Sequence, residues 1–198
     1  MNNSSASTHH QERLSRFEAA LVLANRLHAM QTRKGTDIPY IGHLLAVTSI
    51  VIENGGSEDE RIAALLHDAV EDQGGAKTRA LIHQQFGENV AAIVDGCTDT
   101  DQTPKPPWRT RKEQYIAHLR EASPAVRLVS LADKLHNARS VLHDYRAQGD
   151  EVWSRFSGGK AGTLWYYRAL VNTFHAIEST ALVAELDRVV SELERLAT

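Results

Sequence analysis

The sequence predicts an all-α protein built as one helical domain. Apolar residues recur at intervals of three and four along most of the chain, which is the spacing of one helix face. No convincing alternation of apolar and polar residues extends beyond four residues, so no strand is indicated. Glycine, proline and capping residues divide the chain into segments of ordinary helix length. The 198 residues suffice to bury a core without a disulfide or a structural metal.

The N-terminal part begins with a polar stretch. Residues 1–13 contain no apolar segment, so we expect a disordered tail and no secretory signal, with the domain over 14–198. Apolar residues at helical spacing, with His28 among them, predict a helix over 17–30. A loop rich in Gly and Pro follows. A second helix is predicted over 42–53 because an Asn-Gly-Gly sequence stops it there.

Capping signals locate the remaining helices. Ser57 and Glu60 form a capping box, and the helix that they open is expected to reach residue 72. Ser123 followed by Pro124 is the pattern of an N-cap with proline at the first helical position. The last segment carries a regular apolar stripe. The other helices are predicted over 77–86, 88–98, 111–121, 124–143, 163–178 and 179–196.

Composition excludes several classes of function. The net charge is −3 and the pI is near 6.4, which argues against a nucleic acid polymer as the main partner. No run of 18 apolar residues occurs, so no membrane span is expected. Cys97 is the only cysteine, which rules out an internal disulfide and fits the reducing cytoplasm.

Four titratable residues interrupt an apolar helix. His67 and Asp68 are adjacent, and Glu71 and Asp72 follow one turn later. At that spacing the four groups crowd one side of the helix. Buried charges need a partner, and a divalent cation would serve all of them. The alternative is a solvated acidic helix end, which does not explain His67.

Two further segments carry isolated polar residues. Asp133 follows an apolar run, and Asn137 and Ser140 lie on the same helical face. Taken alone, this is a polar stripe of an amphipathic helix. His43 opens an apolar helix, and a single histidine in such a place is most often a hydrogen-bonded structural residue.

Together, the three segments resemble the H…HD…D arrangement of the HD phosphohydrolase superfamily. The resemblance implies that one divalent ion is held by two imidazoles and two carboxylates. Without a thiolate, such a site leaves positions open for water and substrate. Mixed nitrogen and oxygen ligation suits manganese, iron or zinc. The metal ligands implied are His43, His67, Asp68 and Asp133.

The order of motifs is closer still to one branch of that superfamily. Arg-Lys, a loop and Pro-Tyr-Ile-Gly-His are followed by His-Asp-Ala-Val-Glu-Asp, and later by Leu-Ala-Asp-Lys-Leu-His-Asn-Ala-Arg. This series resembles the hydrolase domain of RelA/SpoT-type alarmone enzymes over about residues 17–175. The chain length leads us to expect a stand-alone small alarmone hydrolase. Leu44 stands where the family often has proline, so the chain departs from the pattern there.

The resemblance implies an activity and a role for each site residue. The family removes pyrophosphate from the ribose 3′ position of (p)ppGpp, usually with Mn²⁺. Glu71 and Asp72 match its acidic pair, expected to manage protons around the attacking water or the leaving oxygen. The residues expected to bind the nucleotide are Arg33, Lys34, Tyr40, Asn137, Ser140, Lys160 and Tyr167.

Other functions stay open at this point. The same pocket chemistry would serve adenosine alarmones (pppApp, ppApp and pApp) or removal of the 2′-phosphate of NADPH. A different HD enzyme, a 5′-nucleotidase or a dNTP hydrolase, is the alternative; the Glu71-Asp72 pair argues against it. A catalytically silent alarmone-binding module would be expected to have lost a ligand or an acid, and this sequence keeps all of them.

Overall fold

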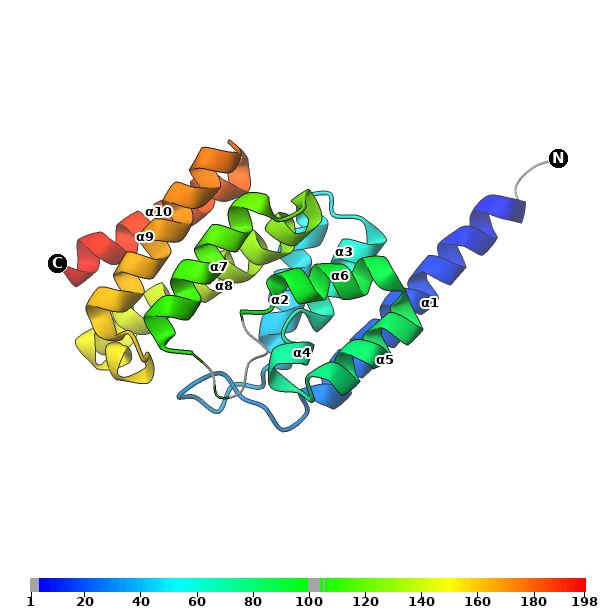
Figure 1. Ribbon diagram of the computed structural model, residues 1–198, viewed down its shortest axis with the longest axis horizontal. Helices are drawn as coiled ribbons and strands as arrows, with labels where there is room; N and C mark the ends of the chain where they lie inside the picture. The colour runs from blue at the N-terminus through cyan, green and yellow to red at the C-terminus, as the bar shows by residue number, and fades with distance from the viewer. Residues whose placement is uncertain (1–3, 100–103, 105) are drawn as a thin grey trace. The chain divides into compact units, whose positions relative to one another are not determined.

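The computed structural model describes residues 4–99, 104 and 106–198, with side chains from residue 16 onward. In these segments every regular element is a helix, and extended pairing is limited to one bridge between Thr32 and Pro39 (Figure 1). The prediction of an all-α protein is therefore confirmed. The chain divides into two compact units, Met1–Thr98 and Asp99–Thr198, and each is described by itself.

The first unit is organised around a short helix whose second half is buried. α3 buries every residue from 62 to 66, and α1, α2 and α6 pack against it. Because α3 ends inside this core, the residues that follow it are delivered to a buried position. The elements of this unit are α1 (Ser4–Leu27), α2 (Ile41–Glu53), α3 (Glu58–Leu66), α4 (Ala69–Asp72), α5 (Ala76–Phe86) and α6 (Glu88–Cys97).

The helix expected to run to residue 72 is interrupted. α3 ends at Leu66, and α4 begins at Ala69. The side chain of His67 provides the reason. Its Nδ1 lies 2.8 Å from the carbonyl oxygen of Ala64, which a continuous helix would offer to the N–H of Asp68. The break therefore falls at the His-Asp pair itself.

The beginning of α1 also differs from the sequence prediction. A disordered tail was expected over residues 1–13, whereas α1 begins at Ser4, well before residue 17. Once a helix is nucleated by its packed part, each added residue gains a backbone hydrogen bond, which favours extension into a polar sequence. Residues 1–3 lie outside the described residues.

The second unit has a long helix at its centre. α8 packs against α10 and η1, while α7 packs against α9, as the green, yellow and red segments of Figure 1 show. The hydroxyl of Tyr115 donates to Ser130 Oγ at 2.9 Å and joins α7 to α8 inside the core. The elements are α7 (Trp108–Glu121), α8 (Pro124–Gln148), η1 (Gly149–Arg155), α9 (Gly159–Ile177) and α10 (Ala181–Ala197).

Local sequence signals set most of the boundaries. The capping box of Ser57 and Glu60 is present, and Ser123 accepts from the N–H of Val126 at the start of α8. The 3-10 turn η1 was not predicted. α7 begins at Trp108, earlier than expected, and the Trp108 ring lies against Gly158. Within the described segments, no helix combines the length and the apolar character needed to cross a bilayer.

Candidate metal centre and active site

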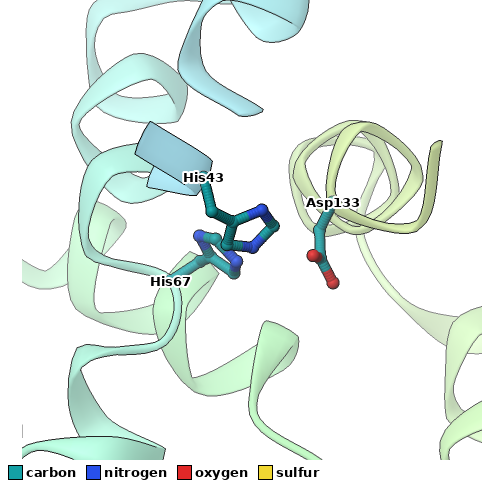
Figure 2. Close-up of side chains that lie close together, drawn as sticks. All are labelled: His43, His67 and Asp133. Atoms are coloured by element: carbon teal, nitrogen blue, oxygen red, sulfur yellow. The ribbon is translucent and has the colours of Figure 1, made fainter. Parts of the chain in front are cut away.

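The two histidines of the first unit lie in its core. His43 is in the first turn of α2, and His67 directly follows α3. Each of the two residues is only 2 % exposed. Their rings meet edge to face with centroids 5.3 Å apart (Figure 2). Burying two imidazoles side by side requires polar partners for their nitrogens.

Asp68 brings a carboxylate oxygen to both rings. Its Oδ2 lies 3.0 Å from Nε2 of His67 and 3.6 Å from Nε2 of His43. Donor atoms that share one ion at bonds of about 2.1 Å are separated by about 3.0 Å at a right angle and about 3.4 Å in a tetrahedron. The carboxylate oxygen thus lies close to a ring nitrogen of each histidine, at separations near those of atoms that ligate a common cation.

The hydrogen bonds around these donors favour metal binding. Because Nδ1 of His67 faces the Ala64 carbonyl, it carries the proton, and Nε2 presents its lone pair to the cluster. The hydroxyl of Tyr40 donates to Asp68 Oδ2 at 2.5 Å and fixes that carboxylate. Such bonds orient ligands in known metal sites. The residues present fit a divalent cation.

Asp133 lies in the second unit, on α8, and is drawn with the two histidines in Figure 2. It is 5 % exposed, and its carboxylate accepts from Asn137 Nδ2 at 2.5 Å and from Lys134 Nζ at 2.6 Å. Burial lowers the pKa of Lys134, but the charge of Asp133 and the nearby Tyr115 and Tyr166 together raise it, and the net pKa lies well above its ordinary value. Asp133 is thus a buried carboxylate of the second unit, oriented by its neighbours on α8.

The acidic pair lies in the short helix α4. Glu71 is half-buried, and Asp72 accepts a hydrogen bond of 2.8 Å from Gln31 Nε2. Partial burial of the carboxyl group raises the pKa of Asp72, and the nearby charges of Asp68 and Glu71 add to this, while the Gln31 hydrogen bond opposes it. A carboxyl group with a raised pKa is suited to proton transfer near neutral pH.

The Arg-Lys loop between α1 and α2 is closed by backbone hydrogen bonds. Arg33 N donates to the carbonyl of Ile38 at 2.8 Å, and Tyr40 N donates to that of Gln31 at 2.9 Å. The guanidinium of Arg33 lies 5.7 Å from the centroid of the Tyr40 ring. Lys34 is exposed in the same loop. The first unit thus brings Arg33 and Tyr40 together with Asp68.

The other predicted substrate residues belong to the second unit. Asn137 and Ser140 share a face of α8, and the Ser140 hydroxyl donates to the carbonyl of His136 at 3.0 Å. Lys160 pairs with Asp150 at 3.1 Å, and Tyr167 is buried in α9. Three basic residues near the start of α7 are partly neutralised. Arg111 and Lys112 contact the carboxylate of Asp99, and Arg109 lies on the ring of Trp165.

Two polar residues near the metal centre, His28 and Gln31, were not identified as site residues from the sequence. His28 is 2 % exposed and stacks on Tyr40, with ring centroids 5.3 Å apart. Gln31 bonds to His28, to Asp72 and to Gln73. The available signal was a histidine on the apolar stripe of a helix, which a purely structural role also explains.

The fold and the site together define an all-α protein with a histidine and carboxylate centre suited to a divalent metal. Comparison with known families is specific: the HD domain family matches residues 20–164, which includes parts of both compact units. The chain belongs to the HD domain family.

Curated relatives and solved structures agree with this assignment. The guanosine-3′,5′-bis(diphosphate) 3′-pyrophosphohydrolase MESH1 of Xenopus tropicalis is 38 % identical over 145 residues, covering 69 % of this chain and 76 % of the relative. The human protein of that name is 37 % identical over 134 residues, covering 66 % and 70 %. A probable GTP pyrophosphokinase of Mycobacterium leprae is 37 % identical over 131 residues, but only 16 % of its length is matched by 65 % of this chain.

Two solved structures share the fold. One, described as a metazoan ortholog of SpoT that hydrolyses ppGpp, superposes with a TM-score of 0.75 at 25 % identity, covering 92 % of this chain and 97 % of the other. A crystal structure of a protein from Listeria monocytogenes EGD-e gives 0.67 at 30 % identity, covering 77 % and 99 %. The resemblance therefore extends through both units of the chain.

Proposed function

We propose that this protein hydrolyses the 3′-pyrophosphate of (p)ppGpp, giving GDP or GTP and pyrophosphate. The observation that carries the proposal is the approach of the Asp68 carboxylate to the buried rings of His43 and His67 in a chain of the HD domain family. Relatives that are named for this activity align with most of their own length. Hydrolysis of a phosphate ester is a reaction for which a bound divalent ion is well suited.

The metal site that we propose has His43, His67, Asp68 and Asp133 as ligands and Mn²⁺ as the preferred ion. Two nitrogens and two carboxylate oxygens form a donor set that manganese accepts, and iron or zinc are alternatives. A bound divalent ion supplies a Lewis acid that lowers the pKa of a coordinated water. The protein fixes its own donors through the Tyr40 hydroxyl, the Ala64 carbonyl and the Asn137 amide.

Glu71 and Asp72 are proposed as the proton-transfer groups. Both lie on α4, directly after the ligand Asp68. One carboxylate takes the proton of the attacking water, and the same proton then serves the ribose 3′ oxygen when the phosphorus–oxygen bond breaks. The pKa of Asp72 is raised, first by partial burial, which favours a role for this group in proton transfer.

Cations and planar groups are proposed to bind the nucleotide. Arg33 has a flat guanidinium that stacks on a purine, and Lys34 is a point charge for phosphate. Tyr40, which contacts Arg33, lines the same side. On α8, Asn137 and Ser140 are the proposed contacts of ribose and base. Lys160 and Tyr167 are proposed for the 5′ phosphates, with Lys160 leaving Asp150 to do so.

Several finer statements accompany the proposal. A small nucleotide is the partner, not a nucleic acid polymer, because the net charge is −3. The cytoplasm is the proposed location, since the single cysteine forms no internal disulfide. Adenosine alarmones and NADPH are further candidate substrates, since both carry a phosphate ester on the ribose that the same centre would reach.

The test is a product assay on metal-stripped protein with Mn²⁺ added back. The compounds are ppGpp, pppApp, pApp, NADPH and the dNTPs, each incubated separately. Release of pyrophosphate from ppGpp only when Mn²⁺ is present supports the proposal, and the ratio to the adenosine compounds gives the base preference. Triphosphate or phosphate from a deoxynucleotide, without turnover of ppGpp, would instead identify the dNTP hydrolase or 5′-nucleotidase alternative.

A further inference from the structure

Gln31 is the centre of a hydrogen-bond network that the reaction proposed above does not yet use. Its side-chain Nε2 donates to Asp72 Oδ2 at 2.8 Å. Its Oε1 accepts from Gln73 Nε2 at 2.6 Å and lies 2.7 Å from His28 Nδ1. Its backbone carbonyl accepts from the N–H of Tyr40 at 2.9 Å. One residue thus connects the loop of residues 28–40 to α4.

The donors and acceptors of this network are fixed by elimination. A carboxylate only accepts hydrogen bonds, so the amide nitrogen of Gln31 must face Asp72 and its oxygen must face His28. That oxygen cannot donate, so Nδ1 of His28 carries the proton. His28 is therefore a donor, and its ring lies at 18° to the plane of the Tyr40 ring, as a stacked pair.

Two residues bonded to Gln31, Tyr40 and Asp72, both contact Asp68 of the candidate metal centre. Tyr40, held by Gln31 through its backbone and by His28 through its ring, donates its hydroxyl to Asp68. Asp72, held by the Gln31 side chain, is also bonded through its N–H to the carbonyl of Asp68 at 3.0 Å. A shift of Gln31 would therefore move two groups together: the Tyr40 hydroxyl that is bonded to Asp68, and the carboxylate of Asp72.

We propose that Gln31 is a positioning residue of this centre, which holds Tyr40 and Asp72 in register with Asp68, and that His28 supports it. Its catalytic consequence rests on the function proposed above, whereas the ordering of the loop does not. A group that acts through others is expected to change kcat more than KM, since it touches neither substrate nor metal.

The test replaces one atom group of Gln31. In Gln31→Glu, the oxygen still accepts from His28 and Gln73, but a second oxygen faces the carboxylate of Asp72, where a hydrogen bond becomes a repulsion. Adding Asp72→Asn restores the hydrogen bond, because the asparagine amide can donate to the second carboxylate oxygen introduced at position 31. Gln84→Glu makes the same change at an exposed position of α5 and is the matched control.

The first readout is amide hydrogen exchange of residues 28–40 in the protein without substrate. In Gln31→Glu, exchange at the N–H groups of Arg33 and Tyr40 is expected to rise about tenfold, because local opening becomes easier. In the double variant it is expected to return to within about twofold of the unmodified protein. Exchange equal to that of Gln84→Glu, or no recovery in the double variant, would overturn the proposal.

The second readout is turnover with Mn²⁺ binding measured alongside. Gln31→Glu is expected to lower kcat at least about tenfold with KM changed less than about threefold. An unchanged kcat with altered exchange contradicts the catalytic part. If the unmodified protein turns over no alarmone, the exchange result still stands and the proposed function alone fails. Gln31→Met, which adds no charge, replaces Gln31→Glu if circular dichroism shows that the latter unfolds, with the same acceleration expected.

Discussion

The hydroxyl of Tyr40 donates a 2.5 Å hydrogen bond to Oδ2 of Asp68, the oxygen that also faces both histidines. Tyr40 precedes α2 and Asp68 precedes α4, so this bond joins the ends of two loops at the centre. Tyr40 therefore does more than line the substrate pocket, because its hydroxyl orients the carboxylate of Asp68, a proposed metal ligand.

Tyr40→Phe is expected to weaken Mn²⁺ binding about tenfold, since loss of a group that orients a ligand has an effect of this order. The stacking on His28 is kept by phenylalanine, so the fold should be unaffected. Isothermal titration with Mn²⁺ measures the change. Tyr145→Phe is the matched control, because its hydroxyl contacts Asp150 in the second unit. Equal affinity in both variants would contradict the role of Tyr40.

Loss of a proposed ligand should remove metal-dependent turnover and leave the helices intact. Asp68→Asn and His67→Ala each delete one donor of the cluster. Asp68 Oδ2 is the oxygen that faces the rings of both His43 and His67. We therefore expect turnover to fall below about a thousandth of the original, as for loss of a metal-activated water. Far-UV circular dichroism checks the fold. Full activity in either variant would disprove the metal assignment.

Glu71 and Asp72 are distinguished by their kinetics. Glu71→Gln is expected to lower kcat by more than about 10²-fold if Glu71 transfers the proton, which is the usual contribution of such a group. If only KM rises, Glu71 positions substrate and Asp72 remains the proton-transfer group. Asp72→Asn, measured at the same pH with saturating Mn²⁺, gives the complementary value. Unchanged kinetics in both variants would exclude the acidic pair from the reaction.

The sequence predicted the parts of this protein that depend on neighbouring residues. The Ser57–Glu60 capping box and Pro124 behind Ser123 act within one turn, and both are present. The break at residues 67–68 was not predictable, because it depends on a side chain competing for a backbone carbonyl. The role of Gln31 requires contacts with Asp72 and Gln73, more than 40 residues away in the chain, which periodicity does not encode.

The candidate site residues also divide into those that the sequence could indicate and those that depend on how the helices pack. The His67-Asp68 pair was recognisable because polar residues in an apolar helix need an explanation. The pairing of Lys160 with Asp150 was not, since both are surface charges whose contact depends on how η1 and α9 pack. Sequence therefore indicated the donor types, and the structure supplied the hydrogen bonds that orient them.

Gly158→Ala is expected to destabilise the second unit by about 1–3 kcal/mol through overpacking. A Cβ there would lie 2.6 Å from Cη2 of the Trp108 ring, closer than two carbon atoms approach. At Gly162 the nearest ring atom is 3.2 Å away, so a smaller loss is expected. Gly42→Ala is the control, because a Cβ there would meet no heavy atom of the described residues within 4 Å beyond its chain neighbours and its own helix backbone. Urea unfolding followed by circular dichroism should rank the three variants in this order.

The contact between Arg168 and Asp187 should make the stability of the second unit depend on pH. The hydrogen bond from Arg168, 2.7 Å long, is the main reason that the pKa of Asp187 is lowered, against the opposing effect of burial. A lowered pKa in the folded state means that the stabilisation is present above the unfolded pKa of about 3.9 and is lost as pH falls through the folded value.

Asp187→Asn is accordingly expected to reduce the free energy of unfolding at pH 7 by about 0.5–1 kcal/mol, a value kept small because the pair is solvent-accessible. The difference from the unmodified protein should shrink as the pH is lowered below about 4, since the aspartate is then protonated in the unfolded chain. Urea unfolding at a series of pH values measures it, with Asp37→Asn in an exposed loop as the control. A difference that stays constant down to pH 2 would show that Asp187 acts by packing and not by charge.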